Sequence, residues 1–181
     1  MNRRHFLLQT SGLAVGALAA AGLTRAATTA KGTKMNELDT LDSIKPLDKP
    51  HEEWRDQVST DAYAVLFEEA TERPFTSPLN DEKREGTFVC AACYLPLFTS
   101  ETKYDSGTGW PSFFDPIEGH IGTKRDFKLL LPRTEYHCIR CGGHQGHVFS
   151  DGPRPTGKRY CNNGVALKFI VKGEDLPDLR S

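Results

Sequence analysis

The chain has 181 residues, of which 38% are hydrophobic and 26% are charged, a composition typical of one soluble globular domain with a short extension. Its formal net charge is -1. Without the first 26 residues, 20 basic and 24 acidic residues remain, which leaves a net charge of -4. This balance excludes the strongly basic surface that binding to nucleic acid or an anionic membrane requires.

Residues 1–26 are interpreted as a targeting signal. Arg3 and Arg4 precede 19 uncharged residues, 6–24, that are rich in Ala and Gly, and small residues suitable for cleavage follow at Thr24 and Ala26. The pattern resembles a twin-arginine export signal, a route for folded proteins, and therefore predicts a periplasmic location. The uncharged run is also long enough to span a bilayer, so an uncleaved anchor is the alternative.

Residues 27–47 lack apolar periodicity and are interpreted as a disordered tether. The folded domain is predicted over 48–172, and it begins with two short helices. Asp48 is the expected cap of the first helix and Ser59 of the second. Apolar residues of the second helix recur at helical spacing: Tyr63, Leu66, Phe67 and Ala70.

After Pro74 the helical period disappears, and short apolar runs bounded by Gly, Pro, Asn or Asp follow. These runs predict small antiparallel strands. The predicted strands are 87–89, 95–98, 112–114, 127–131, 134–138, 147–149 and 166–171. Residues 173–181 are expected to form a poorly ordered tail. The predicted fold class is mainly β, with two helices on the N-terminal side.

Four of the five cysteines form two C-x-x-C pairs. Each pair presents two thiolates from one tight turn, and two pairs complete the tetrahedral shell of a structural zinc ion. The candidate ligands are Cys90, Cys93, Cys138 and Cys141. Two disulfides are the alternative in an oxidising compartment, and a redox-active C-x-x-C is a third interpretation, although the flanking βαβ pattern of a thioredoxin-like domain is missing.

The fifth cysteine, Cys161, is the candidate nucleophile. A lone cysteine is often only a small buried apolar residue. However, Lys158 and Arg159 precede it and can lower its pKa, which favours the reactive thiolate. Asn162 and Asn163 add polar groups to a stretch that otherwise has the pattern of a strand.

Two histidines and a tryptophan complete the set of candidates. His144 and His147 lie in a glycine-rich segment, and each ring can exchange a proton near neutral pH. Surface histidines and extra metal ligands are the alternatives. Trp110 lies between Gly109 and Pro111, where its ring can pack in the core or present a face to a small apolar group.

Several segments resemble, in the same order, motifs of the methionine-R-sulfoxide reductases of the B type. They include S-G-T-G-W-P-S-F at 106–113, C-G-G-H-Q-G-H-V-F at 141–149, D-G-P-R-P-T-G at 151–157 and R-Y-C at 159–161. The resemblance extends over about 52–171. It implies two small antiparallel sheets with N-terminal helices, and an enzyme that reduces methionine-R-sulfoxide, free or in oxidised proteins, to methionine.

The resemblance also implies roles for individual residues. Cys161 matches the catalytic cysteine, which attacks the sulfoxide sulfur and becomes a sulfenic acid. Arg159 matches the arginine that supports the thiolate, and Trp110 matches the tryptophan that packs on the substrate S-methyl group. The residues that orient substrate and water and help protonate the oxygen are matched by His144, His147 and Asn163. The ligands of the zinc-containing branch are matched by Cys90, Cys93, Cys138 and Cys141.

The chain departs from the family pattern in four places. Thr108 stands where many members carry a resolving cysteine, so we expect a monomeric enzyme with one catalytic cysteine, recycled directly by an external thiol or a thioredoxin-like reductant. Gln145 and Asn162 stand where aliphatic residues are usual, and Gly164 stands where serine is usual.

Two other classes of function would account for part of the cysteine pattern. One is a zinc-knuckle binding module without chemistry, in which Cys161 is buried and inert. The other is a cysteine hydrolase that uses Cys161 with a histidine and needs an oxyanion hole. Neither explains why the tryptophan segment and the paired histidines occur together.

Overall fold

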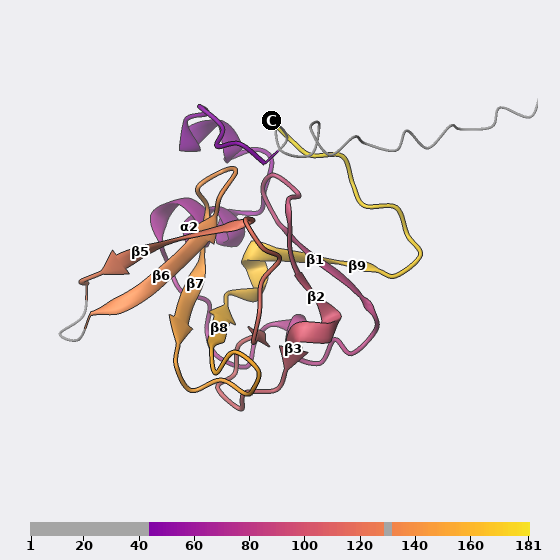
Figure 1. Ribbon diagram of the computed structural model, residues 1–181. Coiled ribbons are helices and arrows are strands. Elements are labelled where there is room, and N and C mark those ends of the chain that lie inside the picture. The colour runs from indigo at the N-terminus through magenta and orange to yellow at the C-terminus, as the bar shows by residue number, and fades with distance from the viewer. Residues whose placement is uncertain (1–43, 129–131) are drawn as a thin grey trace, which may run out of the picture. The chain divides into compact units, whose positions relative to one another are not determined.

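The computed structural model describes residues 44–128 and 132–181 (Figure 1). The predicted export signal and most of the tether lie outside the described residues. Among the helices that the structure describes, none has the length and apolar character needed to cross a bilayer.

The N-terminal side contains one α-helix, α2 (Thr60–Glu68), preceded by a 3-10 turn, η1 (His51–Trp54). Ser59 caps α2 as predicted, because its Oγ accepts a hydrogen bond from the Ala62 amide at 3.2 Å. The first predicted helix is present only as η1, which lacks a side-chain cap. Ser59 starts the next helix so soon after Trp54 that the chain has no room for a longer first helix.

Two antiparallel sheets form the rest of the domain, which confirms the predicted fold class. The three-stranded sheet has the order β2-β1-β9, and the six-stranded sheet has the order β3-β4-β8-β7-β6-β5. The strands are β1 (Gly86–Cys90), β2 (Pro96–Thr99), β3 (Lys103–Tyr104), β4 (Ser112–Phe113), β5 (Ile121–Asp126), β6 (Arg133–Cys138), β7 (His144–Phe149), β8 (Arg159–Asn162) and β9 (Leu167–Val171). Three further 3-10 turns are η2 (Pro78–Asn80), η3 (Ser100–Thr102) and η4 (Gly164–Ala166).

Three strands that the structure describes, β3, β5 and β8, were not among the predicted ones, and the predicted strand 127–131 is wrong over its described residues. Of the run 127–131, the described residues Phe127 and Lys128 lie outside any strand. The strand β5 precedes them and consists mostly of Gly, Thr and charged residues, so a search for apolar runs misses it. Likewise β8 was not among the predicted strands, because its apolar content is low.

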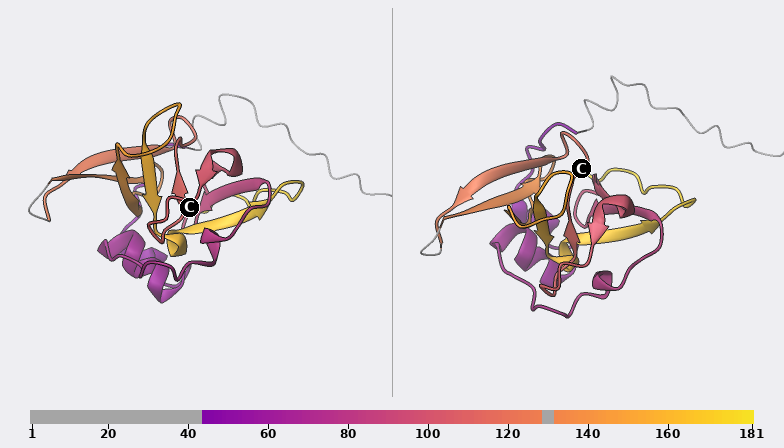
Figure 2. Two further views of the ribbon diagram at one scale, coloured as in Figure 1. Left: turned by 90° about the horizontal axis from the view of Figure 1, so that it is seen from below. Right: turned by 60° about the horizontal axis from the view of Figure 1, so that its bottom comes forward.

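An aromatic cluster joins the two sheets, which lie side by side with the β5–β6 hairpin extending beyond the other strands (Figures 1 and 2). Phe98 of one sheet stacks on Phe113 of the other with ring centroids 4.2 Å apart. Phe88 meets Phe113 edge to face at 4.9 Å, and Tyr136 meets Tyr160 at 5.3 Å. Such pairs add to the stabilisation from burial. They also hold in place β8, the strand that carries Cys161, and its neighbour β4.

The C-terminal segment 173–181 packs back onto the domain instead of extending freely as expected. The Arg180 amide donates to the Cys93 carbonyl at 3.1 Å, and the Arg180 guanidinium lies 4.0 Å from the centroid of the Tyr94 ring. Arg180 also donates to the Gln57 carbonyl at 2.8 Å. The segment therefore covers the turn that carries the first C-x-x-C pair.

Candidate active site

One row of paired residues crosses all the strands of the six-stranded sheet. The row runs from β3 to β5 through Tyr104, Ser112, Cys161, His147, Glu135 and Lys124. Residues directly opposite each other in antiparallel strands have neighbouring side chains on one face of the sheet. Strand pairing therefore places His147 between the Cys161 thiol and the Glu135 carboxyl group.

His144 reaches the same face because β7 contains a bulge. Residues three apart in a regular strand point to opposite faces. Here Tyr136 pairs with Gly146 while His137 pairs with His144, so β7 holds one extra residue at this point. The two histidine rings consequently face each other, with centroids 5.4 Å apart.

The close approach of β7 to β8 requires glycine at position 146. A Cβ atom on Gly146 would lie 1.9 Å from the Cys161 carbonyl oxygen. Any side chain there would push apart the strands that carry His147 and Cys161. The glycine is thus part of what brings the predicted nucleophile and the predicted acid/base residue together.

A pocket of about 230 Å³ opens over Cys161. Its lining residues are Thr71, Trp110, Arg133, Gly146, His147, Phe149, Cys161, Asn162 and Asn163. The Trp110 ring is held by its Nε1, which donates to the Glu72 carbonyl at 3.0 Å. Four predicted site residues from distant parts of the sequence therefore share one cavity, namely Trp110, His147, Cys161 and Asn163.

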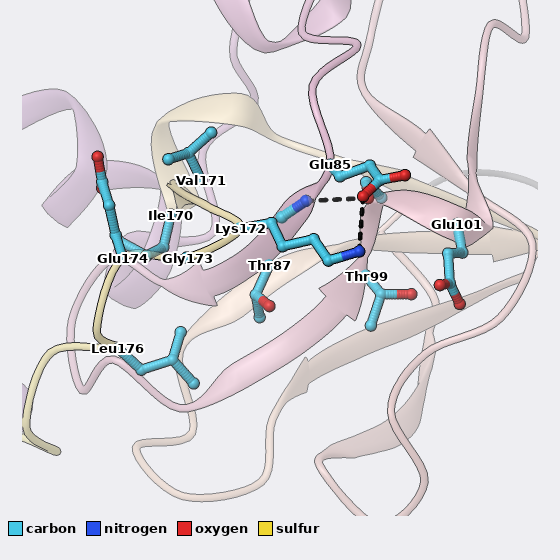
Figure 3. Close-up of a pocket in the computed structure, with 12 residues that line it drawn as sticks. Glu85, Thr87, Thr99, Glu101, Ile170, Val171, Lys172, Gly173, Glu174 and Leu176 are labelled. Carbon is cyan, nitrogen blue, oxygen red and sulfur yellow. Dashed lines mark hydrogen bonds and ion pairs between the residues drawn. The ribbon is translucent and has the colours of Figure 1, made fainter.

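A second hollow, of about 300 Å³, lies at the edge of the three-stranded sheet (Figure 3). Its charged groups include Glu85, which accepts a hydrogen bond from Lys172 Nζ at 2.7 Å, and Glu101. None of the predicted site residues lines it. The Cys161 pocket is therefore the candidate site because of the reactive side chains that line it, although the second hollow has the larger volume.

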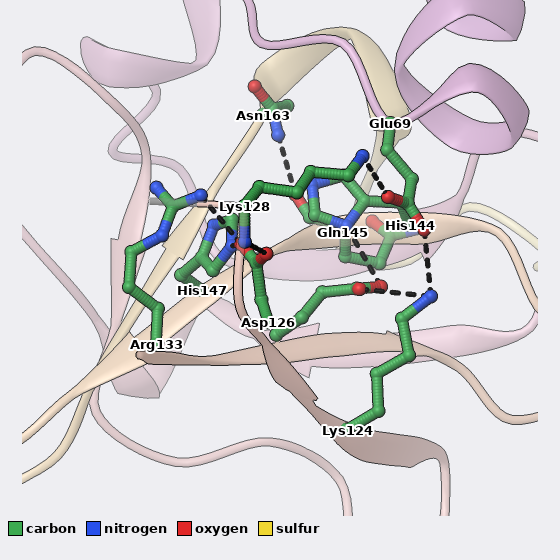
Figure 4. A network of polar contacts seen from close by, with 10 residues as sticks. Glu69, Lys124, Asp126, Lys128, Arg133, His144, Gln145, His147 and Asn163 are labelled. Atoms are coloured by element: carbon green, nitrogen blue, oxygen red, sulfur yellow. Dashed lines mark hydrogen bonds and ion pairs between the residues drawn. The ribbon is translucent and has the colours of Figure 1, made fainter. Parts of the chain in front are cut away.

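Each histidine of the site faces a carboxylate (Figure 4). His147 Nε2 lies 2.7 Å from Asp126 Oδ2, and His144 Nδ1 lies 3.0 Å from Glu135 Oε1. Neither acid could be identified from the sequence, because strand pairing, and not closeness to the histidine motif in the chain, brings each one to its histidine. The only available signal was an acidic residue in the apolar β6 run, and Glu135 is indeed just 3% exposed.

The pKa shifts define the protonation state of the His147–Asp126 pair. Hydrogen bonds from the Lys128 amide, His147 and Arg133 hold the pKa of Asp126 well below its usual range. Burial lowers the pKa of His147, against the opposing effect of its hydrogen bond to Asp126. At pH 7 Asp126 is therefore ionised and His147 neutral, with the Nε2 proton directed at the carboxylate and Nδ1 left as an acceptor.

Behind the histidines, lysine and glutamate side chains connect the hairpin to α2 (Figure 4). Lys124 Nζ lies 3.1 Å from Glu135 Oε2 and 2.8 Å from Glu69 Oε1, and Lys128 also pairs with Glu69. Hydrogen bonds from the two lysines lower the pKa of Glu69 to about 2. Because Glu69 ends α2, these pairs anchor the β5–β6 hairpin, and with it the two carboxylates, to the helix.

The pKa of the Cys161 thiol is raised by burial, a net direction opposite to that expected from its neighbours in sequence. Arg159 does act as expected, because its charge and a hydrogen bond lower the thiol pKa. A hydrogen bond from Thr108 also lowers it, whereas Lys158 is not among the groups that do. The resting side chain is therefore mainly a thiol that must lose its proton to react.

Arg159 lies beside the pocket and does not line it. Its Nε and Nη2 each donate to the Asp151 carboxylate at 2.9 Å, and its guanidinium lies 4.3 Å from the centroid of the Phe149 ring. These contacts fix a charge that is only 8% exposed. The Arg159 charge therefore stays in a fixed position, from which it lowers the pKa of the Cys161 thiol.

A chain of hydroxyl groups leads away from the thiol. Ser106 Oγ lies 2.8 Å from Thr108 Oγ1 and 2.7 Å from Ser112 Oγ. Thr108 in turn hydrogen-bonds to Cys161. The position at which the family resemblance suggested a missing resolving cysteine is therefore occupied by a hydroxyl donor in contact with the reactive sulfur.

The other four cysteines are buried and form a separate cluster whose Sγ atoms all lie within 4.8 Å of one another. Cys90 Sγ is 3.6 Å from Cys141 Sγ, and Cys93 Sγ is 3.5 Å from Cys138 Sγ. These separations are too long for disulfides, whose S–S bond is about 2.05 Å. They fit the edge of a tetrahedron around one ion, about 3.8 Å for metal–sulfur bonds of about 2.3 Å.

Comparison with known proteins agrees with this arrangement. The SelR domain family matches residues 58–171. The chain belongs to the SelR family. Proteins named "Peptide methionine sulfoxide reductase MsrB" are its relatives. The one from Methanosarcina barkeri is 48% identical over 131 residues, which is 72% of this chain and 92% of the relative.

Two bacterial relatives are slightly more similar in sequence. The protein from Bradyrhizobium diazoefficiens is 53% identical over 125 residues, 68% of this chain and 90% of its own length. The protein from Pseudomonas putida is 51% identical over 127 residues, 70% of this chain and 96% of its own length. Among solved structures, the Mis18 'Yippee-like' domain has a TM-score of 0.40 and 20% identity, covering 50% of this chain and all of its own.

In this SelR domain the side chain of Asn163 is held on both sides. Its Oδ1 accepts from the Glu72 amide at 2.9 Å, and its Nδ2 donates to the Gln145 carbonyl at 3.0 Å. Glu72 thus holds both Asn163 and Trp110, one from each of its backbone groups. The segment after α2, which also contributes Thr71 to the lining, is therefore a wall of the pocket.

Proposed function

We propose that the protein reduces methionine-R-sulfoxide to methionine with Cys161 as the nucleophile. By its family relationships the chain is a peptide methionine sulfoxide reductase. The observation that carries the proposed mechanism is the single pocket that holds a thiol, a carboxylate-bound histidine and a tryptophan ring together.

The reaction begins with removal of the thiol proton. His147 pairs directly with Cys161 across β7 and β8, and its Nδ1 is the acceptor because Asp126 holds the proton on Nε2. The Arg159 charge favours the thiolate as it forms. His147 is therefore the general base for the thiol and, once protonated, the general acid for the substrate oxygen.

The thiolate sulfur then attacks the sulfoxide sulfur as the sulfoxide oxygen takes up a proton. The S–O bond of the substrate breaks, the oxygen ends on Cys161 as a sulfenic acid, and methionine leaves as a thioether. The substrate sulfur gains two electrons, and the cysteine sulfur loses two. The net reaction joins thiolate, sulfoxide and one proton to give sulfenic acid and thioether.

Trp110 and Asn163 orient the substrate. The Trp110 ring lines the pocket opposite polar groups, so the S-methyl group packs on the ring while the oxygen points toward His147 and Asn163. Only one arrangement of methyl group and oxygen about the chiral sulfur satisfies both contacts with the thiol below. This requirement selects one epimer, which the resemblance to the B-type reductases indicates is the R epimer.

The four-cysteine cluster holds one zinc ion with a structural role. All four positions are filled by thiolates from the chain, so no position remains for water or substrate. The first C-x-x-C pair joins β1 to β2, and the second joins β6 to β7. The ion therefore fastens the three-stranded sheet to the six-stranded sheet.

An external reductant restores the enzyme. The four other cysteines are buried in the cluster, and Thr108 contacts Cys161. The sulfenic acid is therefore reduced directly by a small thiol or a thioredoxin-like protein. Acting as a monomer in the periplasm after export by its twin-arginine signal, the enzyme repairs oxidised methionine in proteins or as the free amino acid.

The decisive assay measures reduction of each epimer of a methionine sulfoxide substrate, with dithiothreitol as reductant. The protein should turn over the R epimer alone, and Cys161→Ser should be inactive. Turnover by Cys161→Ser, or equal turnover of the S epimer, contradicts the proposal. A binding module without chemistry would show no turnover even in the unaltered protein.

A further inference from the structure

Two amide side chains are fully buried in the core next to the pocket. Gln145 and Asn162 are both 0% exposed, and the Tyr136 side chain beside them is 0% exposed as well. Gln145 is the extra residue of the bulge between the two histidines, and Asn162 lies between Cys161 and Asn163. The two strands that carry the proposed chemistry therefore each place one amide in the core.

The buried amides form a continuous chain of hydrogen bonds. Gln145 Nε2 donates to Cys90 Sγ at 3.5 Å, and Asn162 Nδ2 donates to Gln145 Oε1 at 3.3 Å. The Tyr136 hydroxyl donates to Asn162 Oδ1 at 2.6 Å. The second Asn162 Nδ2 proton goes to the Asn163 carbonyl at 2.8 Å. The chain thus leads from a ligand of the metal cluster to the backbone of a pocket residue.

The metal ligand fixes the direction of every bond in this chain. A metal-bound thiolate accepts hydrogen bonds and cannot donate them, so Gln145 must turn its NH₂ group toward Cys90. Its carbonyl oxygen then faces Asn162, which in turn must present its own carbonyl oxygen to Tyr136. A flip of either amide would break at least two of these bonds.

Burial of two amides is expected to lower the stability of the folded protein. Burying an amide in an apolar core is unfavourable when its hydrogen bonds are imperfect, and apolar residues of similar volume are often at least as stable. The 3.3 Å contact between the two amides is long for an N–H···O hydrogen bond, so strong hydrogen bonding alone does not explain them. Their position between the metal cluster and the pocket suggests a positioning role.

We propose that Gln145 and Asn162 form a positioning relay that couples the Cys90 metal ligand to strands β7 and β8. The Gln145 donor stabilises the metal-bound thiolate and so helps to retain the ion. The hydrogen bonds of Asn162 to Gln145 and to the Asn163 carbonyl fix the positions of Cys161 and Asn163 relative to the metal cluster. The effect on turnover rests on the proposed function, whereas the effect on metal retention does not.

The test uses the full chain with zinc bound and two nearly isosteric changes, Gln145→Met and Asn162→Leu, alone and combined. The first readout is transfer of zinc to a chromogenic chelator. Gln145→Met and the double variant should bind zinc about tenfold more weakly, a typical effect of losing a hydrogen bond to a metal ligand. Asn162→Leu should lower kcat for methionine-R-sulfoxide several-fold with little change in KM.

Phe169→Leu is the matched control for lost stability. Phe169 packs on Phe88 with ring centroids 4.8 Å apart, and it touches neither the relay nor the pocket. The control should lower Tm without changing zinc retention or kcat. A change of zinc retention in Phe169→Leu equal to that in Gln145→Met would show that general loosening is the cause and would overturn the proposal.

The double variant separates the relay from simple filling of the core. With both amides gone, neither leaves the other unpaired, although the Tyr136 hydroxyl still lacks its acceptor, so Tm should recover part of the loss expected from the two single changes. If zinc retention and kcat recover together with Tm, the amides are only core residues and the proposal is wrong. If the unaltered protein lacks reductase activity, the proposed function fails, while zinc retention still tests the relay.

Discussion

His147 Nε2 and Asp126 Oδ2 lie 2.7 Å apart although β6 separates their strands. Asp126 reaches across from the end of β5, where Arg133 and the Lys128 amide also bind its carboxylate. Each of these donors favours the ionised acid. The carboxylate therefore selects one tautomer of His147, the one whose Nδ1 is free to accept the Cys161 proton.

Replacing Asp126 with asparagine should lower kcat for methionine-R-sulfoxide at least about tenfold at pH 7, with little change in KM. A neutral amide neither holds the Nε2 proton in place nor stabilises the charged imidazole. Steady-state kinetics measures the change, and Asp115→Asn, at an exposed position, is the control. A kcat equal to that of the unaltered protein would show that the tautomer of His147 does not limit the reaction.

Asp126 should also make stability depend on pH. Its pKa in the folded protein is depressed, so the stabilisation it supplies is complete above its unfolded value of about 4 and is lost as the pH falls through the folded value. The difference in Tm between the unaltered protein and Asp126→Asn should be largest near pH 7 and shrink below about pH 4. Thermal unfolding at several pH values measures it. A difference that grows on acidification would contradict this assignment.

Alkylation of Cys161 should report the charge of Arg159. Burial raises the thiol pKa and Arg159 lowers it, so Arg159→Met should raise it further and slow the reaction with iodoacetamide at pH 7 at least about threefold. The rate should rise with pH in both proteins, with the midpoint higher in the variant. Lys158→Met should behave like the unaltered protein. Equal slowing by both substitutions would mean that net charge, not the Arg159 position, matters.

The sequence revealed the reactive residues better than the scaffold that joins them. The cysteine pairs could be recognised because metal binding needs four thiolates in two tight turns, and the predicted cluster is present. Asp126 and Glu135 could not be recognised, because their partners are set by strand pairing and not by local spacing. The bulge at Gln145 could not be recognised either. Simple alternation places His144 and His147 on opposite faces of the sheet, whereas the structure places them on the same face.

The direction of the Cys161 pKa shift shows another limit of local reasoning. Neighbouring basic residues suggested a lowered pKa, but burial depends on the whole fold and raises it. Lys158, three positions before Cys161, is not a leading cause of any lowering, while Thr108, 53 positions away, is. Adjacent residues in a strand point to opposite faces, so closeness in sequence is a poor guide to contact with the thiol.

The oxidised enzyme should carry a sulfenic acid at Cys161. Treatment with methionine-R-sulfoxide in the absence of reductant should give one dimedone adduct by mass spectrometry, because Thr108 cannot form a disulfide. Thr108→Cys places a thiol beside the reactive sulfur, and it should convert the adduct to an intramolecular disulfide. Finding a disulfide of Cys161 in the unaltered protein would show instead that a cysteine leaves the metal cluster during the reaction.

Removing the metal should loosen the junction of the two sheets and thereby stop the chemistry. Cys90 ends β1 and Cys93 follows in the turn to β2, while Cys138 ends β6 and Cys141 lies in the turn to β7, so an ion bound by all four would join both sheets. Without it, four buried thiols 3.5 to 3.6 Å from their nearest partners have no common ligand.

Cys138→Ser, or incubation with a strong chelator, should therefore lower Tm by at least about 10 °C and abolish reductase activity together. Metal analysis should find one zinc per chain in the unaltered protein and less in the variant. Cys161→Ser is the matched control, since it removes a thiol outside the cluster and should leave both zinc content and Tm unchanged. A Cys138→Ser protein that lacks zinc but keeps its Tm would show that the aromatic contacts between Phe98 and Phe113 suffice to join the sheets.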